Sequence, residues 1–277
     1  MRLNLRIEEG LKAVLNSLVE AIKERLGEDL ISLVLYRQTF EAEVLDNEEV
    51  NLAIICSRRP SLEDKIYILK RGGPSLIPLF LTPRDFRELA KGGALLAHCL
   101  AKYSKVIHGK EALEKLIEEE PPMVTKHTLE FLRRASLSCL SLSLEDYLSK
   151  RIQDVRYHLL RSFDYLIKWV ALKKGLDIPF SKAEIIEVVS LQGIEPELNE
   201  LCWELVNKGA FDSEVALRRA LKLYPKVLKV KLPSLTEVIK EVRGLKVLRV
   251  GISIRGNRGS FLITLIDGEV REVRIGG

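Results

Sequence analysis

The chain has 277 residues, of which 47% are hydrophobic and 30% are charged, and its formal net charge is +5 at pH 7. This length accommodates two domains with separate cores, and the composition is typical of a soluble globular protein. No apolar run approaches the roughly 18 residues that cross a membrane, and the N-terminus lacks a secretory signal. We therefore expect no membrane partner, a cytoplasmic location and, from the many charges and few Gln and Asn residues, a thermophile-like composition.

The first 120 residues alternate between helix and strand patterns, which predicts a small α/β unit with a mixed sheet. Ser61 and Thr82 stand where helix N-caps are expected, and Pro83 follows at a first helical position. Pro78 places the third strand at a sheet edge or a bulge. We expect helices at 7–27, 61–71, 83–91, 93–103 and 110–119, strands at 30–37, 49–56, 75–81 and 105–107, and an extension of the first hairpin at 40–44.

Residues 118–122, Glu-Glu-Glu-Pro-Pro, form the clearest boundary, and the pattern beyond them is helical. From residue 247 the period becomes two, and Asp267-Gly268 between strand patterns is a strong hairpin signal. We expect helices at 124–148, 150–174, 181–190, 195–208, 212–223 and 234–242, and strands at 247–254, 261–266 and 270–275. The predicted fold class is α+β, with a mixed-sheet domain at 1–120, a helical bundle at 123–230 and a small basic antiparallel β tail at 231–277.

The four cysteines, Cys56, Cys99, Cys139 and Cys202, are widely separated and lie in apolar runs. They form no CxxC pair, and no histidines stand near them at the spacing of metal ligands. We interpret them as buried, reduced thiols and predict no metal site from them.

Positive charge concentrates between residues 221 and 258, which contain ten lysines and arginines and two glutamates. This local excess of eight is larger than that of the whole chain and favours a polyanionic partner, although a solvated face is the other interpretation. Arg255 precedes the predicted turn of the tail at 256–259, and Arg258 lies within that turn. With Arg249, Arg271 and Arg274 they indicate either a basic sheet face for nucleic acid, in which Phe261 is the one aromatic residue, or an ordinary charged edge.

Residues 8–118 resemble the nucleotidyltransferase fold of the polymerase-beta-like superfamily. The resemblance rests on Leu-Val-Leu-Tyr-Arg at 33–37, Glu-Val-Asn-Leu-Ala-Ile-Ile at 49–55, Phe-Leu-Thr-Pro-Arg-Asp-Phe at 80–86 and the run from Gly92 to Gly109. It implies a Gly-Ser phosphate grip after the first strand and an Asp-x-Asp pair on the second. A third carboxylate on the next core strand would complete a site for two magnesium ions.

The chain departs from that pattern at each position. Tyr36 and Arg37 replace the Gly-Ser pair, Glu49 and Asn51 replace the paired aspartates, and the strand at 75–81 has no acid. Asn is neutral, whereas magnesium prefers carboxylates. We therefore interpret the first domain as a catalytically degenerate nucleotidyltransferase without a metal cofactor, with Tyr36 and Arg37 as candidate ligand-binding residues.

The helical region resembles the substrate-binding or HEPN-type bundles that follow such domains. HEPN ribonucleases use an Arg and a His separated by four to six residues, and Arg151 and His158 fit that spacing. Seven positions apart on one helix they would share a face, where His serves as acid or base near neutral pH. A surface pair or helix-packing residues is the alternative.

These observations favour a regulatory or binding protein with nucleotide or RNA as its ligand. Two enzymatic alternatives remain: a divergent magnesium-dependent nucleotidyltransferase that uses Glu48 or Glu49 with Asn51, and a HEPN-like ribonuclease that uses Arg151 and His158. A scaffold that forms a homodimer through the helical domain is a further alternative.

Overall fold

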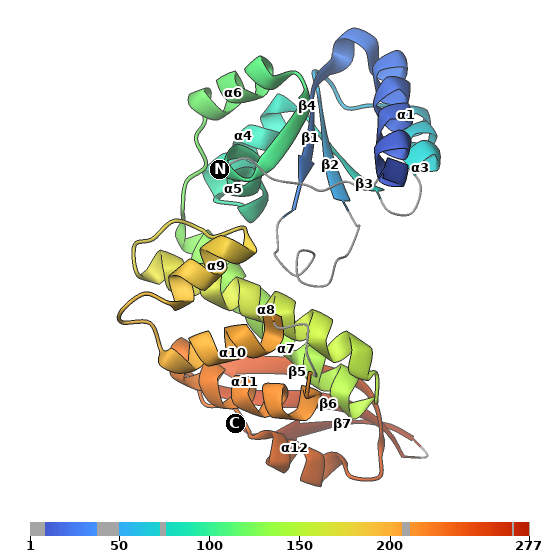
Figure 1. Ribbon diagram of the computed structural model, residues 1–277. Helices are drawn as coiled ribbons and strands as arrows, with labels where there is room; N and C mark the ends of the chain where they lie inside the picture. The colour runs from blue at the N-terminus through green and yellow to red at the C-terminus, as the bar shows by residue number, and fades with distance from the viewer. Residues whose placement is uncertain (1–8, 38–49, 73–75, 207–210, 268, 277) are drawn as a thin grey trace. The chain divides into compact units, whose positions relative to one another are not determined.

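The computed structural model describes residues 9–37, 50–72, 76–206, 211–267 and 269–276. The described chain forms two compact units, one ending at Leu129 and the other beginning at Glu130 (Figure 1). The fold class is α+β, as the sequence predicts. No helix in the described ranges is both long enough and apolar enough to cross a membrane.

The first unit alternates helices and strands. In chain order its elements are α1 (Glu9–Leu26), a 3-10 turn (Gly27–Asp29), β1 (Leu30–Tyr36), β2 (Val50–Cys56), α3 (Leu62–Gly72), β3 (Leu76–Leu81), α4 (Pro83–Gly92), α5 (Leu95–Lys102), β4 (Ser104–His108) and α6 (Lys110–Glu119). The sequence predicts each of these α-helices and strands to within a few residues, whereas the 3-10 turn is not among its predictions. The predicted extension at 40–44 lies outside the described residues.

The four strands form one mixed sheet in the order β3-β2-β1-β4. β1 is antiparallel to β2 and to β4, whereas β2 and β3 run parallel. Parallel neighbours need a crossover connection, and α3 provides it between β2 and β3. Pro78 lies in the edge strand β3, where a residue without an N–H is tolerated, so the predicted edge position is confirmed.

The sheet of the first unit is covered on both faces. Leu33, Leu35, Leu52 and Ile54 point to one face and pack with α1 and with Ile68 of α3. The alternate residues point to the other face, which α4, α5 and α6 cover (Figure 1). Burial of both faces explains why β1 is apolar throughout rather than alternating.

Two helices of this unit begin at the predicted caps. The Thr82 hydroxyl accepts a hydrogen bond from the Asp85 N–H at 3.2 Å, and the Asp85 carboxylate accepts one from the Thr82 N–H at 2.9 Å. Ser61 and Asp64 make the same reciprocal pair at 3.1 Å in each direction. Each box satisfies two N–H groups that a helix start otherwise leaves without partners.

The second unit is mainly helical and ends in three strands. Its elements are α7 (Lys126–Leu148), which begins in the first unit, α8 (Ile152–Lys173), α9 (Lys182–Val189), α10 (Pro196–Val206), α11 (Ser213–Leu228), α12 (Leu235–Val242), β5 (Lys246–Arg255), β6 (Arg258–Asp267) and β7 (Glu269–Ile275). The sequence predicts the end of α11 at residue 223, but the helix continues through Pro225 to Leu228. Tyr224 and Leu228 are buried in the core, and their packing outweighs the unfavourable proline.

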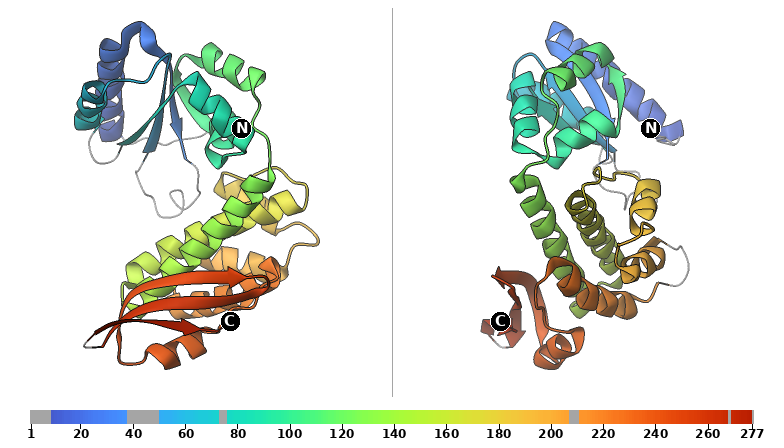
Figure 2. Two further views of the ribbon diagram at one scale, coloured as in Figure 1. Left: turned by 180° about the vertical axis from the view of Figure 1, so that it is seen from behind. Right: turned by 90° about the vertical axis from the view of Figure 1, so that its left-hand side faces the viewer.

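The three strands form an antiparallel sheet in the order β5-β6-β7. One face of this sheet contributes Val250, Ile263, Leu265 and Ile275 to the same hydrophobic core as the buried residues of α7 to α12. The other face is not covered by the helices, and the strands lie in front of them in the rear view of Figure 2. The division of this region into a bundle and a tail at residue 231 stays a prediction.

Candidate functional site

A row of register partners marks the end of the first sheet at which the resemblance places a nucleotide site. Tyr36 of β1 lies opposite Asn51 of β2 and Ser104 of β4, and Asn51 lies opposite Ile77 of β3. Partners across neighbouring strands point to the same face of a sheet. The row thus presents a phenol, an amide, a hydroxyl and an alkyl group side by side.

Tyr36 is buried at 5% exposure. Burial, with a smaller contribution from the nearby Cys99, raises the pKa of its phenol to about 12. The group is therefore neutral at physiological pH and does not serve as a base there. The next residue, Arg37, receives a hydrogen bond from the Cys99 thiol on its carbonyl oxygen at 2.9 Å. The phenol of Tyr36 and the thiol of Cys99, which belongs to α5, thus occupy the space next to the end of β1.

Among the described residues of this domain, no acidic side chain belongs to the row. Glu49 and Glu48 lie outside the described residues, and β3 contains no acid in its sequence. Asp85, the acid that follows β3, closes the capping box of α4 and pairs with Arg59 at 2.9 Å, and these contacts lower its pKa. Within the described ranges no three His, Cys, Asp or Glu side chains gather as ligands for a metal ion.

The second unit brings Arg151 and His158 together through a third residue. Asp146, near the end of α7, is 3% exposed. Its carboxylate accepts hydrogen bonds from Arg151 Nε at 3.0 Å and from His158 Nδ1 at 2.5 Å. Arg151 precedes α8 instead of lying within it, so the predicted shared helix face does not form. The buried carboxylate joins the two side chains instead.

Glu145 extends this cluster to the small sheet. One of its oxygens accepts from Arg151 Nη2 at 3.0 Å, and the other accepts from the Val250 N–H of β5 at 3.0 Å. The paired carboxylates raise the pKa of Arg151, which remains charged. Glu145 and Asp146 therefore link α7, the start of α8 and β5 through charge-assisted hydrogen bonds, which are the stronger kind.

The cluster has two chemical properties of an acid–base site. A carboxylate that accepts from Nδ1 fixes the proton on that nitrogen and leaves Nε2 for exchange with a ligand. His158 is 24% exposed and Arg151 is 50% exposed, so both are accessible to solvent. Sequence reasoning missed Asp146 because it lies on the preceding helix. The signal available was the acid pair Glu145-Asp146 just before the helix break.

Positive charge gathers on the uncovered face of the small sheet. Register partners there are Arg249 with Thr264 and Glu272, Leu262 with Arg274, and Arg255 with Arg258. We call this surface the basic face and define it by Lys246, Arg249, Arg255, Arg258 and Arg274, all of which are exposed. In the register of the strands, Glu272 is the carboxylate that lies in the same row as Arg249 on this face. Phe261 is fully buried on the opposite face, so it offers no ring for stacking.

The cations of the basic face differ in their pairing from several other exposed cations of the chain. Among the described residues, none of the five makes a side-chain ion pair or hydrogen bond. By contrast, the exposed Arg84 pairs with Glu88 at 3.0 Å, and Lys226 pairs with Glu197 at 2.8 Å. Of the predicted ligand-binding residues, Arg255 and Arg258 lie on this face and Tyr36 and Arg37 lie in the first unit.

No protein-family model and no curated protein matches the chain. Nine chains of solved structures match it, and one of them is a nucleotidyltransferase-like protein from Exiguobacterium sibiricum 255-15. It is 12% identical, the match covers 92% of this chain and 98% of that chain, and the TM-score is 0.31. A TM-score this low carries no argument about the fold, so the fold is described from the chain's own strand order and register. These describe an α+β protein with an N-terminal mixed sheet and a C-terminal helical unit that carries an open basic sheet.

Proposed function

We propose that the protein binds RNA through the basic face, and that its nucleotidyltransferase-like domain does not catalyse nucleotidyl transfer. The observation that carries the proposal is the group of five cations on an uncovered sheet, none of which is paired with a described carboxylate. Cations without carboxylate partners keep their full attraction for phosphates and release counterions on binding.

The described residues of the basic face include no aromatic ring, and this indicates the mode of binding. Single-strand binders that use stacking place aromatic side chains on their surface, and Phe261 is buried here. Binding through Arg and Lys therefore acts on the phosphate backbone and carries little base selectivity. From Arg249 to Arg255 the strand rises by about 20 Å at about 3.3 Å per residue, which accommodates several nucleotides.

The first domain supports the non-catalytic part of the proposal through the chemistry of its row. Tyr36 is neutral at physiological pH, Asn51 carries no charge, and Ile77 is alkyl. Phosphoryl chemistry with two magnesium ions needs carboxylates that hold both ions near the transferred phosphate. This row supplies none of them, which favours a retained fold over a retained reaction.

The test is the salt dependence of RNA binding by the full chain. Fluorescence anisotropy with a labelled 20-nucleotide single-stranded RNA of mixed sequence measures Kd between 50 and 300 mM NaCl. Five phosphate contacts predict a slope of log affinity against log salt of about −3.5, at about −0.7 for each contact. The Arg255→Ala/Arg258→Ala double variant should reduce that slope by about 1.4.

A matched control is Arg84→Ala/Lys91→Ala, which removes the same charge from exposed, paired cations of the first unit. This variant should retain the slope of the unmodified protein. An affinity that does not depend on salt, or an unchanged slope in Arg255→Ala/Arg258→Ala, would contradict the proposal. Addition of ATP at millimolar concentration tests whether a single nucleotide competes for the same face.

The cluster at Asp146 favours a second function, a metal-independent ribonuclease of the HEPN type. His158 would exchange a proton at Nε2, Asp146 would orient the ring, and Arg151 would face the phosphate. Cleavage of the labelled RNA should then persist in EDTA and disappear in His158→Ala, with the circular dichroism spectrum unchanged. RNA that stays intact during incubation with the unmodified protein excludes this second function and leaves the binding proposal standing.

A further inference from the structure

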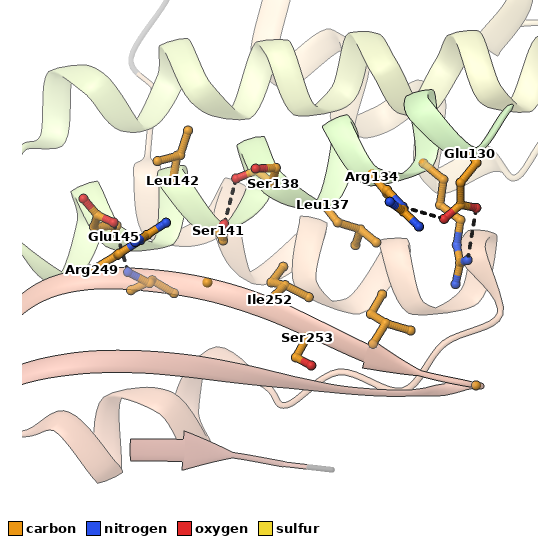
Figure 3. Close-up of a pocket in the computed structure, with 15 residues that line it drawn as sticks. Glu130, Arg134, Leu137, Ser138, Ser141, Leu142, Glu145, Arg249, Ile252 and Ser253 are labelled. Carbon is orange, nitrogen blue, oxygen red and sulfur yellow. Dashed lines mark hydrogen bonds and ion pairs between the residues drawn. The ribbon is translucent and has the colours of Figure 1, made fainter. Parts of the chain in front are cut away.

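A cleft of about 810 Å³ lies between α7 and the edge of β5 (Figure 3). Its α7 side contains residues from Glu130 to Glu145 at helical spacing, and its other side is β5 from Arg249 to Ile254. At one end Glu145 accepts from the Val250 N–H at 3.0 Å, and this hydrogen bond closes the cleft there. The other end, beside Glu130 and Arg134, lies fifteen residues earlier on α7.

The backbone of β5 turns a regular set of polar groups into this cleft. In an antiparallel ladder, alternate residues direct both their N–H and their C=O away from the partner strand. Because the Val250 N–H points to Glu145 rather than to β6, Ile252 and Ile254 point the same way. Their N–H and C=O groups have no strand partner on that side among the described residues, because the sheet order places β5 at an edge.

The cleft has the volume of one added strand. A strand rises by about 3.3 Å per residue, lies about 4.8 Å from its neighbour and occupies a layer about 10 Å thick. Six residues therefore fill about 950 Å³, which is close to the 810 Å³ of the cleft. Glu145 occupies the edge at Val250, so the open edge begins at Gly251 and the cleft lining continues past Ile254 to Gly256.

The two faces of such a strand would meet different surroundings. Leu137 of α7 and the side chains of Ile252 and Ile254 line the core side, and all three belong to or pack against the hydrophobic core. The cations lining the cleft are Arg133, Arg134 and Arg249. Arg133 and Arg134 share one carboxylate, Glu130, at 3.8 and 2.7 Å.

The acids of the cleft leave its positive charge in excess. Glu145, the second acid, is paired with Arg151, which lies outside the cleft lining. One of the three lining cations is thus matched by Glu130, and two are not matched within the cleft. A ligand with carboxylates on one face and apolar side chains on the other complements this arrangement.

We propose that the cleft binds an extended peptide, supplied by a partner protein, in which apolar and acidic residues alternate, and that this peptide adds a fourth strand to the sheet at β5. Main-chain hydrogen bonds to Ile252 and Ile254 provide affinity, and the alternation provides selectivity. The Glu145 contact with Val250 sets the end of the added strand and thereby its register. This site shares Arg249 with the basic face, but its main-chain contacts lie at the edge of β5, and peptide binding there goes beyond the RNA-binding role proposed for that face.

The test uses the full chain and a labelled, capped ten-residue peptide that alternates Val and Asp. Its affinity, measured by fluorescence anisotropy, should fall at least tenfold in Ile252→Pro, which removes one edge N–H and blocks pairing. Ile252→Val keeps the N–H and should bind as the unmodified protein does. Val270→Pro, at an exposed position of the opposite edge strand β7, is the matched proline control and should also bind normally.

Two altered peptides and one measurement of mass complete the test. A Val-Asp peptide methylated on alternate backbone nitrogens should bind at least tenfold more weakly, and so should a Val-Lys peptide. Equal binding of the Val-Asp peptide to Ile252→Pro and to the unmodified protein would overturn the proposal. It would also be overturned if light scattering shows a dimer that Ile252→Pro dissociates while the peptide does not bind, because a second copy would then occupy the edge.

Discussion

Replacement of Lys168 by Met should destabilise the second unit strongly. Lys168 and Asp164 form an ion pair one helical turn apart on α8, and both side chains are 0% exposed. The ammonium of Lys168 also lies 5.1 Å from the centre of the Phe180 ring. Met has a similar length and fills the space, but it leaves the buried carboxylate of Asp164 without its ammonium partner. Removal of one member of a buried pair costs about 3–5 kcal/mol.

The assay is thermal unfolding followed by circular dichroism. A loss of 3 kcal/mol or more lowers Tm by at least about 6 °C in a unit of this size. Lys173→Met removes an exposed lysine from the same helix, whose contact is a cation–π pair with Trp169, and should cost no more than about 1 kcal/mol. The Asp164→Leu/Lys168→Met double variant removes both charges and should recover most of the loss. A cost below about 1 kcal/mol for Lys168→Met would refute this reasoning, because a buried carboxylate would then tolerate the loss of its cation.

Two further predictions concern the first unit. The phenol of Tyr36 has a pKa raised to about 12, so its stabilising contribution is complete below pH 10 and is lost as the pH rises through about 12. The assay is the difference between the alkaline absorbance titrations of the unmodified protein and Tyr36→Phe, which should show a transition near pH 12. A transition near pH 10 would contradict the burial of the phenol. Gly109 has a φ of +68°, and a Cβ there would lie 1.9 Å from the Ile31 carbonyl oxygen. Gly109→Ala should therefore cost at least about 2 kcal/mol of unfolding free energy, measured by urea unfolding. Gly175→Ala is the control, with φ +74° and open space around it, and should cost about 1 kcal/mol. Equal costs would show that the backbone at Gly109 shifts to relieve the clash.

The sequence predicts the local structure of this chain well because its capping and breaking residues stand where the hydrophobic periodicity begins and ends. Ser61 and Thr82 cap helices as expected, and Pro78 marks an edge strand. The end of α11 is the exception. A proline inside a helix is unfavourable locally, and the buried Tyr224 and Leu228 that keep the helix intact are identified through tertiary packing.

The candidate sites are predicted in part. The spacing of Arg151 and His158 places them near each other, but the carboxylate that joins them, Asp146, belongs to another helix. The cations of the tail are visible in the sequence. Which of them share a face depends on the bulge between Val247 and Arg249, which shifts the register by one residue. Arg271 lies on the opposite face from Arg274 because the two are three residues apart on β7 and strand side chains alternate between faces.

The hydrogen bond between Glu145 and Val250 joins residues 105 positions apart. During synthesis at about 5–20 residues per second, Glu145 of α7 is made roughly 5–20 s before β5, whose Val250 N–H donates to it. Throughout that interval the helices lack the apolar residues Val250, Ile263 and Leu265, which complete their core. The nascent helical unit therefore exposes apolar surface until the last strands leave the ribosome. Chaperones that shield apolar helices would act in that interval.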